Sequence, residues 1–363
     1  MRLIMIEILI LLQNRNILSI MKYGRNQINK AGEEMMTSKD PIIVKSAIEK
    51  INDWRSLHTI VLELLQNRVN TLLSTNSIPI VLSSHRLKRL ASIQYKLDVN
   101  PTMRLGGMQD IGGLRIVVEN INTLNALNVL LHKSTFDGFK FEKYYNYVEA
   151  PKNSGYRSIH FIYKFVSIDN NYDGLRVELQ IRTKLQHSWA MAVETAELTT
   201  QTRLKSSQGA DEWLNYFKVI ASLFAIKEET PILSMHQDNN NNMYDLMKIF
   251  YEMDSHYHLS EKLKALRITT KHAIDEENND GYYILNINFQ KQTVTVSSYS
   301  IDKEEQANDH YTRLERASKE DLNAVVLVSV PRMRELQEAY PSYFLDTKDF
   351  LTALDTMKEN CKK

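Results

Sequence analysis

Two stretches of the chain decide its fold, Arg157–Val166 (RSIHFIYKFV) and Gly174–Thr183 (GLRVELQIRT). Apolar and polar side chains alternate in both, which is the pattern of strands that bury one face. Gly174 supplies the turn before the second strand. We therefore predict strands over 157–166 and 175–181, and a helix over 184–198 that opens at Thr183.

The sequence around these strands adds helices and one more strand. Apolar spacing predicts helices over Ser46–Leu73 and Ser83–Leu97. Leu114–Val118 is a short apolar run after two glycines, which is typical of a strand. The predicted fold class is α+β, with a mixed, mainly antiparallel sheet flanked by helices.

The C-terminal third is predicted to form a separate small α+β domain. Helices are expected over 211–227 and 243–267, followed by a polar break at 275–280. After it we expect a hairpin near 283–296, a helix (304–318), an apolar strand (324–330) and two helices (331–339 and 347–359). The chain then divides into an N-terminal extension (1–40), a motif-bearing domain (41–205), a helical connector (206–275) and the C-terminal domain (276–363).

Composition limits the protein classes that remain. The 363 residues hold 45 Lys and Arg against 44 Asp and Glu, a net charge of +1, so a bulk cationic nucleic-acid binder is not expected. The single cysteine, Cys361, excludes a disulfide framework and fits a reducing, cytoplasmic setting. Residues 1–20 are apolar but interrupted by Glu7, whereas a spanning helix needs about 20 apolar residues. We expect an upstream extension before a start at Met21, with a peripheral membrane helix as the alternative.

The first candidate site segment is rich in cations. Four polar residues fall in one predicted helix: Arg86, Lys88, Ser92 and Lys96. Lysine and arginine give charge-assisted hydrogen bonds to phosphates, although a solvated basic helix face would have the same composition.

A carboxylate follows, next to a glycine turn. Asp110 precedes Gly112-Gly113, and carboxylate oxygens are the ligands that Mg²⁺ prefers. Arg115 could stack on a base or pair with a phosphate. A plain turn with a surface arginine is the alternative.

The decisive strands carry the other candidate residues. Cations, a ring and an imidazole gather at the entrance of the first strand: Lys152, Tyr156, Arg157 and His160. An aromatic ring beside cations can hold a nucleobase next to phosphates, or it can simply pack in a hairpin. Glu178, Gln180 and Arg182 share one face of the second strand, where Glu178 could act as general base or metal ligand, or the face could simply be exposed.

In order and spacing these segments resemble the synthetase domain of the RelA/SpoT family. The resemblance covers about Ala47 to Glu197 and is carried by RLKRLASIQYK (86–96), DIGGLR (110–115), PKNSGYRSIH (151–160) and VELQIRT (177–183). It implies Mg²⁺-dependent transfer of the β,γ-pyrophosphate of ATP to a ribose 3′-hydroxyl.

The resemblance also implies roles for individual residues. Arg86 and Arg115 would hold the adenine of ATP, with Lys88 and Lys96 on its phosphates. Asp110 would bind Mg²⁺, and Glu178 would be the metal-linked general base. Tyr156 would stack on the acceptor base, and three residues would line the acceptor side: Gln180, Arg182 and His187.

The tail resembles that of CapRel-type fused toxin–antitoxins, whose C-terminal domain is a pseudo-zinc-finger without metal ligands. A Y-x-x-Y motif, here Tyr340 and Tyr343, would cover the nucleotide site. This subgroup pyrophosphorylates the 3′-CCA end of tRNA, and a phage protein such as the major capsid protein releases the block in anti-phage defence. Two alternatives remain open: an alarmone synthetase that uses GDP, GTP or an adenosine nucleotide as acceptor, and a catalytically dead nucleotide-sensing module.

Overall fold

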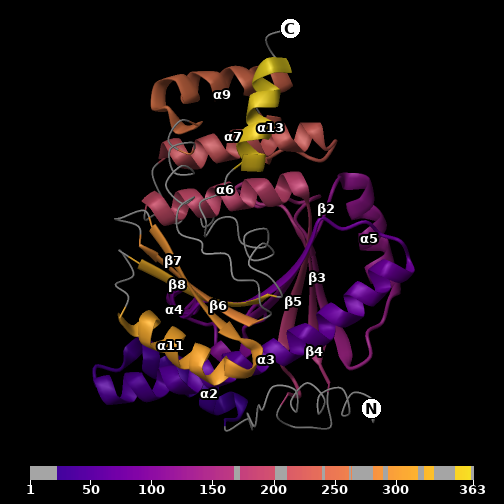
Figure 1. Ribbon diagram of the computed structural model, residues 1–363. Coiled ribbons are helices and arrows are strands. Elements are labelled where there is room, and N and C mark those ends of the chain that lie inside the picture. The colour runs from indigo at the N-terminus through magenta and orange to yellow at the C-terminus, as the bar shows by residue number, and fades with distance from the viewer. Residues whose placement is uncertain are drawn as a thin grey trace.

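The chain folds into a central sheet with helices on both sides, a smaller sheet beside it and a stack of helices above it (Figure 1). The structure is a computed structural model that describes residues 23–166, 172–200, 211–238, 242–260, 263, 281–288, 293–317, 323–330 and 348–360. The first part of the chain forms α2 (Arg25–Thr37), α3 (Pro41–Thr75), β1 (Leu82–Leu87), α4 (Leu90–Asp98), η1 (Leu105–Gly107), β2 (Gly112–Val118), α5 (Ile121–Lys133), β3 (Phe139–Asn146), β4 (Ile159–Phe165), β5 (Arg176–Thr183) and α6 (Lys184–Thr200). The remainder forms α7 (Asp211–Lys227), α8 (Ser234–Asp238), α9 (Met243–Tyr257), β6 (Gly281–Asn288), β7 (Thr293–Ser300), η3 (Ile301–Lys303), α11 (Glu304–Ala317), β8 (Asn323–Val330) and α13 (Lys348–Asn360).

The central sheet is mixed and mainly antiparallel, as the sequence predicts. Its five strands run in the order β1-β2-β5-β4-β3, and only the β2–β5 pair is parallel. The predicted strands around 157–166 and 175–181 are observed as β4 and β5, and the helix after Thr183 as α6. The parallel β2–β5 pair therefore sits at the centre of the sheet, between two antiparallel neighbours.

The helix predicted over Ser83–Leu97 is wrong in its first half. That segment is divided between the edge strand β1 and the helix α4. Residues 82–87 pair with 117–112 of β2, so tertiary pairing outweighs a weak helical periodicity. Ser83 and Ser84 also favour this outcome, because serine competes with helical hydrogen bonds.

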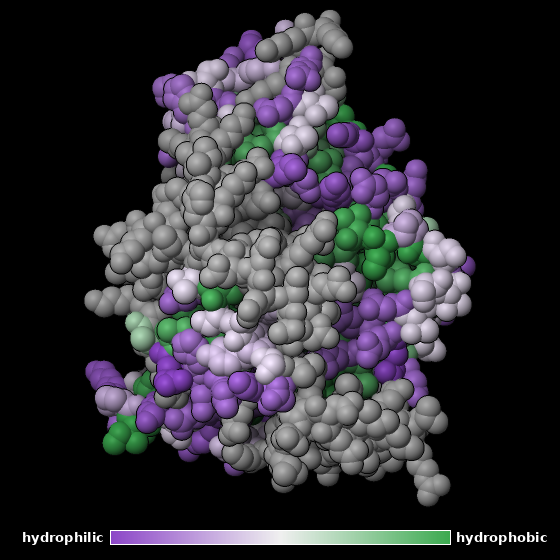
Figure 2. Space-filling model, in the orientation of Figure 1, coloured by the Kyte–Doolittle hydropathy of each residue, from purple (hydrophilic) through white to green (hydrophobic). Residues whose placement is uncertain are grey.

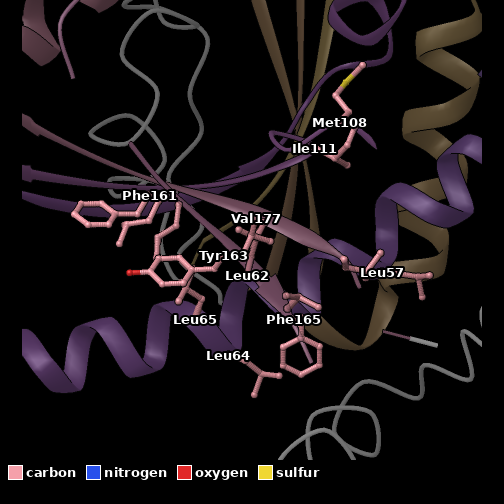
Figure 3. Packing of buried hydrophobic residues seen from close by; sticks show 14 of the residues in the cluster. Leu57, Leu62, Leu64, Leu65, Met108, Ile111, Phe161, Tyr163, Phe165 and Val177 are labelled. Atoms are coloured by element: carbon pink, nitrogen blue, oxygen red, sulfur yellow. The ribbon is translucent and has the colours of Figure 1, made fainter. Parts of the chain in front are cut away.

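One face of the sheet packs on the long helix α3. Figure 3 shows Tyr163 and Phe165 of β4 close to leucines of α3, in the apolar cluster that also holds Phe161. The approach is closest at Gly112, where an added Cβ would lie 3.0 Å from a methyl carbon of Leu62. A side chain at this position would press on Leu62 and His58, so glycine suits the close contact.

A second apolar cluster joins α6, α7, α9 and α13. It includes Trp213 and Phe217 of α7, Phe250 of α9, and Phe350 of α13. Figure 1 shows these helices above the central sheet, with α13 crossing the others. The last described helix therefore packs with the connector helices.

The smaller sheet, β7-β6-β8, is antiparallel and carries α11. The predicted helix over 331–339 lies outside the described residues. On the face seen in Figure 2, hydrophilic residues predominate among those described, and hydrophobic ones form small separate patches. No helix in the described ranges is long and apolar enough to cross a membrane.

Candidate active site

The sequence-predicted site residues gather on the polar face of the central sheet, opposite α3. In-register residues of neighbouring strands lie side by side on one face. Glu178 pairs with Gly113, which in turn pairs with Arg86 across β2. An added Cβ at Gly113 would meet only the Arg86 carbonyl oxygen, at 4.0 Å. The glycine therefore leaves open space between an arginine on β1 and a carboxylate on β5.

The residues predicted to bind ATP, the pyrophosphate donor, lie around Asp110, and we call this part of the face the donor side. The loop before β2 holds its carboxylate, which accepts hydrogen bonds of 2.9 Å from the ammonium groups of Lys88 and Lys96. Burial alone would raise the pKa of Asp110, but these two cations hold it well below its usual range. The aspartate is thus ionised at neutral pH, and three predicted residues, from the turn after β1, from α4 and from the loop before β2, meet at one point.

Other predicted donor residues surround this cluster. Arg86 lies 3.7 Å from a carboxylate oxygen of Glu194 on α6, and Arg115 is buried in β2. Ser92 is half-buried on the first turn of α4. The arginines therefore lie on neighbouring strands, with Arg86 of β1 opposite Gly113 and Arg115 two residues after Gly113 on β2.

The acceptor side is a closed ring of five hydrogen-bonded side chains, which we call the side-chain ring: Tyr156, His160, Glu178, Gln180 and Arg182. His160 bridges the first two links, with Nε2 2.9 Å from the Tyr156 hydroxyl and Nδ1 2.7 Å from Glu178 Oε1. Gln180 donates to Glu178 Oε2 at 2.6 Å and accepts from Arg182 at 2.9 Å. Arg182 closes the ring by donating to the Tyr156 hydroxyl.

The ring fixes the charge of its members. Burial alone would lower the pKa of His160, but Tyr156 and Glu178 raise it to about 9. Burial alone would raise the pKa of Glu178, but His160 and the Gln180 hydrogen bond lower it, against the repulsion of Asp110. At neutral pH the pair is an imidazolium facing a carboxylate. Each carboxylate oxygen keeps a second lone pair for a proton or a metal.

The two carboxylates fit a magnesium ion by their chemistry. Mg²⁺ usually takes one or two protein carboxylates together with substrate phosphates. Asp110 and Glu178 border the same face and are close enough to repel each other electrostatically. The described residues form no group of three or more His, Cys, Asp or Glu side chains that could hold a metal ion, here or elsewhere. A magnesium ion at this face would therefore be held by these two carboxylates together with substrate phosphates.

Aromatic residues that the sequence analysis missed extend the acceptor side. Tyr145 and Tyr147 stack with ring centroids 5.8 Å apart, and the Lys152 ammonium lies 4.4 Å from the Tyr147 ring. Tyr156 itself is buried, with the Arg182 guanidinium 4.9 Å from its ring. The aromatic run YYNY (144–147) was the available signal, but the strand β3 that presents it was not predicted.

Besides Lys152, two predicted acceptor residues lie outside the ring. Arg157 is buried and donates to the Val148 carbonyl oxygen at 3.1 Å. His187 is buried on the first turn of α6. Tyr340 and Tyr343 lie outside the described residues, so their covering role stays a prediction.

The C-terminal part contacts the donor side through α11. Buried Arg55 of α3 donates to the Lys88 carbonyl oxygen at 3.0 Å and to the Tyr311 hydroxyl at 3.2 Å. Glu315 of α11 accepts from the backbone N–H of Leu90 at 3.3 Å. Thus α11 holds the backbone on both sides of the turn that follows Lys88.

Comparison with known proteins finds sequence matches in the part of the chain that carries the candidate site. Residues 85–200 match the sequence model of a family described as "Region found in RelA / SpoT proteins". The GTP pyrophosphokinase YwaC of Bacillus subtilis (strain 168) is 31% identical over 119 residues, which cover 31% of this chain and 55% of that relative. The chain thus spans about half the length of this curated relative. The matched residues 85–200 fall in the part of the chain whose motifs resemble the RelA/SpoT synthetase domain.

Solved structures of similar proteins were also found. The small alarmone synthetase 1 of Bacillus subtilis bound to its product pppGpp is 28% identical, with a TM-score of 0.30 over 34% of this chain and 66% of that one. A GTP pyrophosphokinase family protein from Streptococcus pneumoniae is 21% identical, with a TM-score of 0.40 over 53% of this chain and 91% of that one.

Proposed function

We propose that this protein is a Mg²⁺-dependent pyrophosphokinase that transfers the β,γ-pyrophosphate of ATP to a ribose 3′-hydroxyl. The observation that carries the proposal is the pair of ionised carboxylates, Asp110 and Glu178, on one sheet face between donor-side cations and the side-chain ring. The match of residues 85–200 to the RelA/SpoT region supports the same chemistry. It also speaks against a catalytically dead sensing module, since both carboxylates are present.

The proposed reaction uses the chain's residues as follows. The acceptor 3′-oxygen forms a bond to the β-phosphorus of ATP, the bond from that phosphorus to the α,β-bridging oxygen breaks, and AMP leaves. Glu178 takes the hydroxyl proton on a free lone pair, which is worth roughly 10²–10⁴-fold in rate. Lys88 and Lys96 exchange the Asp110 carboxylate for phosphate oxygens, and bound Mg²⁺ neutralises phosphate charge.

For the acceptor we propose the 3′-CCA end of tRNA. Lys140, Lys164 and Arg176 lie in register on β3, β4 and β5, on the same face as Glu178, and the Arg176 guanidinium is paired with Glu142 at 2.6 Å. Such a row of cations beyond the reaction centre suits a polyanion that extends past its reacting nucleotide. The aromatic pair Tyr145 and Tyr147 suits a stacked base.

The alternative acceptor is GDP, GTP or an adenosine nucleotide, which would make the protein an alarmone synthetase. The relative named a GTP pyrophosphokinase favours it. The two proposals separate when the full chain carrying Tyr340→Ala and Tyr343→Ala, which removes the predicted covering motif, is incubated with γ-³²P-ATP and Mg²⁺ in the presence of tRNA or of each nucleotide. Label on tRNA whose 3′ end is intact, but not on tRNA with a periodate-oxidised 3′ end, supports the first; label on nucleotides alone supports the second.

We further propose that the C-terminal part restrains the enzyme and that a phage protein, such as a capsid protein, releases it. The contacts of Tyr311 and Glu315 with Arg55 and Leu90 support a restraint on the donor side. Co-incubation of the full chain with purified capsid protein tests this proposal. Transfer that rises only with the capsid protein supports it, and equal transfer with and without it contradicts it.

A further inference from the structure

A buried carboxylate on the connector ties down the point where the acceptor strand becomes a helix. Thr183 and Gln186 form a reciprocal capping box at the start of α6, with the Gln186 N–H donating to the Thr183 hydroxyl oxygen at 3.1 Å and the Thr183 N–H donating to Gln186 Oε1 at 3.3 Å. Glu228, just after α7, binds both side chains of this box. One of its oxygens accepts from the Thr183 hydroxyl, and the other accepts from Gln186 Nε2 at 2.8 Å.

The position of Glu228 is unfavourable for an ionised carboxylate unless neighbouring groups stabilise the charge. It lies at the C-terminal end of α7, where the helix dipole disfavours a negative charge. Thr183 is fully buried, and Gln186 and Glu228 are 4% and 9% exposed. Burial raises the pKa of Glu228, and the hydrogen bonds from Thr183 and Gln186 oppose that rise, as does the charge of Arg157. The carboxylate is thus surrounded by donors that favour its ionised form.

The charge of the same carboxylate also acts electrostatically on Arg157. This guanidinium is 4% exposed, and its Nε and Nη2 have no hydrogen-bond partner among the described residues. Burial lowers the pKa of Arg157 to about 10, and Glu228 opposes that shift. Arg157 directly follows Tyr156, and Thr183 directly follows Arg182. Glu228 therefore acts on the chain neighbours of two members of the side-chain ring.

Helix α7 also closes the back of the loop that carries Tyr156. Gly155 has φ +95°, and an added Cβ there would lie 2.6 Å from the Cβ of Ala221 on α7. Trp189 of α6 donates its indole N–H to the Phe217 carbonyl oxygen of α7 at 2.9 Å. The connector therefore packs on the acceptor loop as well as on the strand-to-helix junction.

We propose that Glu228 is a positioning residue for the acceptor: by holding the Thr183–Gln186 box and balancing Arg157, it sets the geometry of the side-chain ring. The inference rests on the proposed function, because the ring is assigned there to the acceptor. It adds a residue outside the matched range of 85–200. Its consequence is specific, since loss of Glu228 should impair acceptor use and leave ATP binding, on the other side of Gly113, intact.

An exchange of two side chains tests this geometry in the full chain. E228Q places an amide donor against the Gln186 amide, and Q186E places two carboxylates together. The double variant Q186E/E228Q restores the three hydrogen bonds that the side chains at 186 and 228 make with each other and with Thr183. In it, the amide at position 228 accepts from Thr183 and donates to the carboxylate at position 186, which still accepts from the Thr183 N–H. The measured quantities are the KM for acceptor, the KM for ATP and the amide exchange rates of residues 183–187.

We expect each single variant to raise the acceptor KM by roughly ten- to a hundredfold, as an unsatisfied buried polar group does. The KM for ATP should stay within about twofold, and the double variant should return to within about threefold of the wild type in acceptor KM. An unchanged acceptor KM in folded E228Q overturns the inference. So does an equal rise in both KM values, or a double variant no better than the singles.

Folding failures also decide the question. If the single variants do not fold, the double variant carries the test: normal acceptor KM supports the inference, and an impaired or unfolded double variant overturns it. If neither the wild type nor its Tyr340→Ala/Tyr343→Ala variant transfers pyrophosphate to any acceptor, the proposed function fails. The amide exchange then judges the geometry, with faster exchange in E228Q and wild-type exchange in the double variant as the supporting result, and any other pattern overturning it.

Discussion

The ion pair between His160 and Glu178 predicts that the protein loses stability as the pH rises from 6.5 to 9. Burial opposes the charge of His160, but Tyr156 and Glu178 outweigh it and raise the pKa from 6.5 to about 9. A histidine with a raised folded-state pKa stabilises the fold fully below its unfolded pKa, and that contribution is lost as the pH rises through the folded pKa. At about 1.4 kcal/mol per pH unit, the shift corresponds to a contribution of about 3 kcal/mol.

Replacing His160 by glutamine removes this contribution. We expect the free energy of urea unfolding of the wild type to fall by about 3 kcal/mol between pH 6.5 and pH 9 and then level off, and that of H160Q to stay nearly constant over the same interval. The acid limb of pyrophosphate transfer should also move to higher pH in H160Q. The reason is that His160 is the main group that lowers the pKa of Glu178.

The matched control is H256Q, because His256 is exposed on α9. It should keep both the wild-type pH dependence of unfolding and the wild-type acid limb. His58 and His236 do not mimic the effect, since burial lowers the pKa of His58 to about 4 and lowers that of His236 as well. The same pH dependence of unfolding in H160Q and the wild type would refute the reasoning.

Three further outcomes are expected. Gly113→Ala should lower kcat/KM about tenfold with little loss of stability, because a Cβ there enters open space at the site. Gly112→Ala should instead lower the free energy of urea unfolding by about 1–3 kcal/mol, because its Cβ overpacks against α3. The reverse pattern, with Gly112→Ala impairing only activity and Gly113→Ala only stability, would contradict the geometry. Lys164→Gln should reduce the slope of log binding constant for tRNA against log salt by about 0.7, measured by filter binding, and an unchanged slope would remove this lysine from the acceptor path. Tyr340→Ala with Tyr343→Ala should make the full chain active in pyrophosphate transfer without a trigger, and a folded double variant that stays inactive would place the restraint elsewhere.

The sequence was sufficient to predict which side chains share a face when they lie on a single strand. Glu178, Gln180 and Arg182 were predicted to share a face because side chains alternate along a strand, and they do so in β5. The bonds that close the side-chain ring depend on the pairing of His160 with Gln180 across β4 and β5. Strand register is a tertiary property, so the ring was not predictable from the motifs alone.

Other features required contacts between distant segments. The pattern of 82–87 is compatible with a helix, and only its pairing with β2 makes it a strand. Glu228 lies 45 residues after Thr183 and belongs to no motif, so nothing in the sequence links it to the acceptor side. The contact of Arg55 with Tyr311 spans 256 residues and was likewise outside the reach of local patterns.

The central claim is that Asp110 and Glu178 support transfer of an intact pyrophosphate, and the nucleotide product tests it most directly. The full chain, its Tyr340→Ala/Tyr343→Ala variant, and the same double variant carrying D110N or E178Q are incubated with Mg²⁺, ATP and acceptor, and AMP, ADP and modified acceptor are quantified. The account predicts one AMP formed for each acceptor modified, with formation of both abolished by D110N and by E178Q. Release of ADP in place of AMP, or near-normal transfer by E178Q, would contradict it.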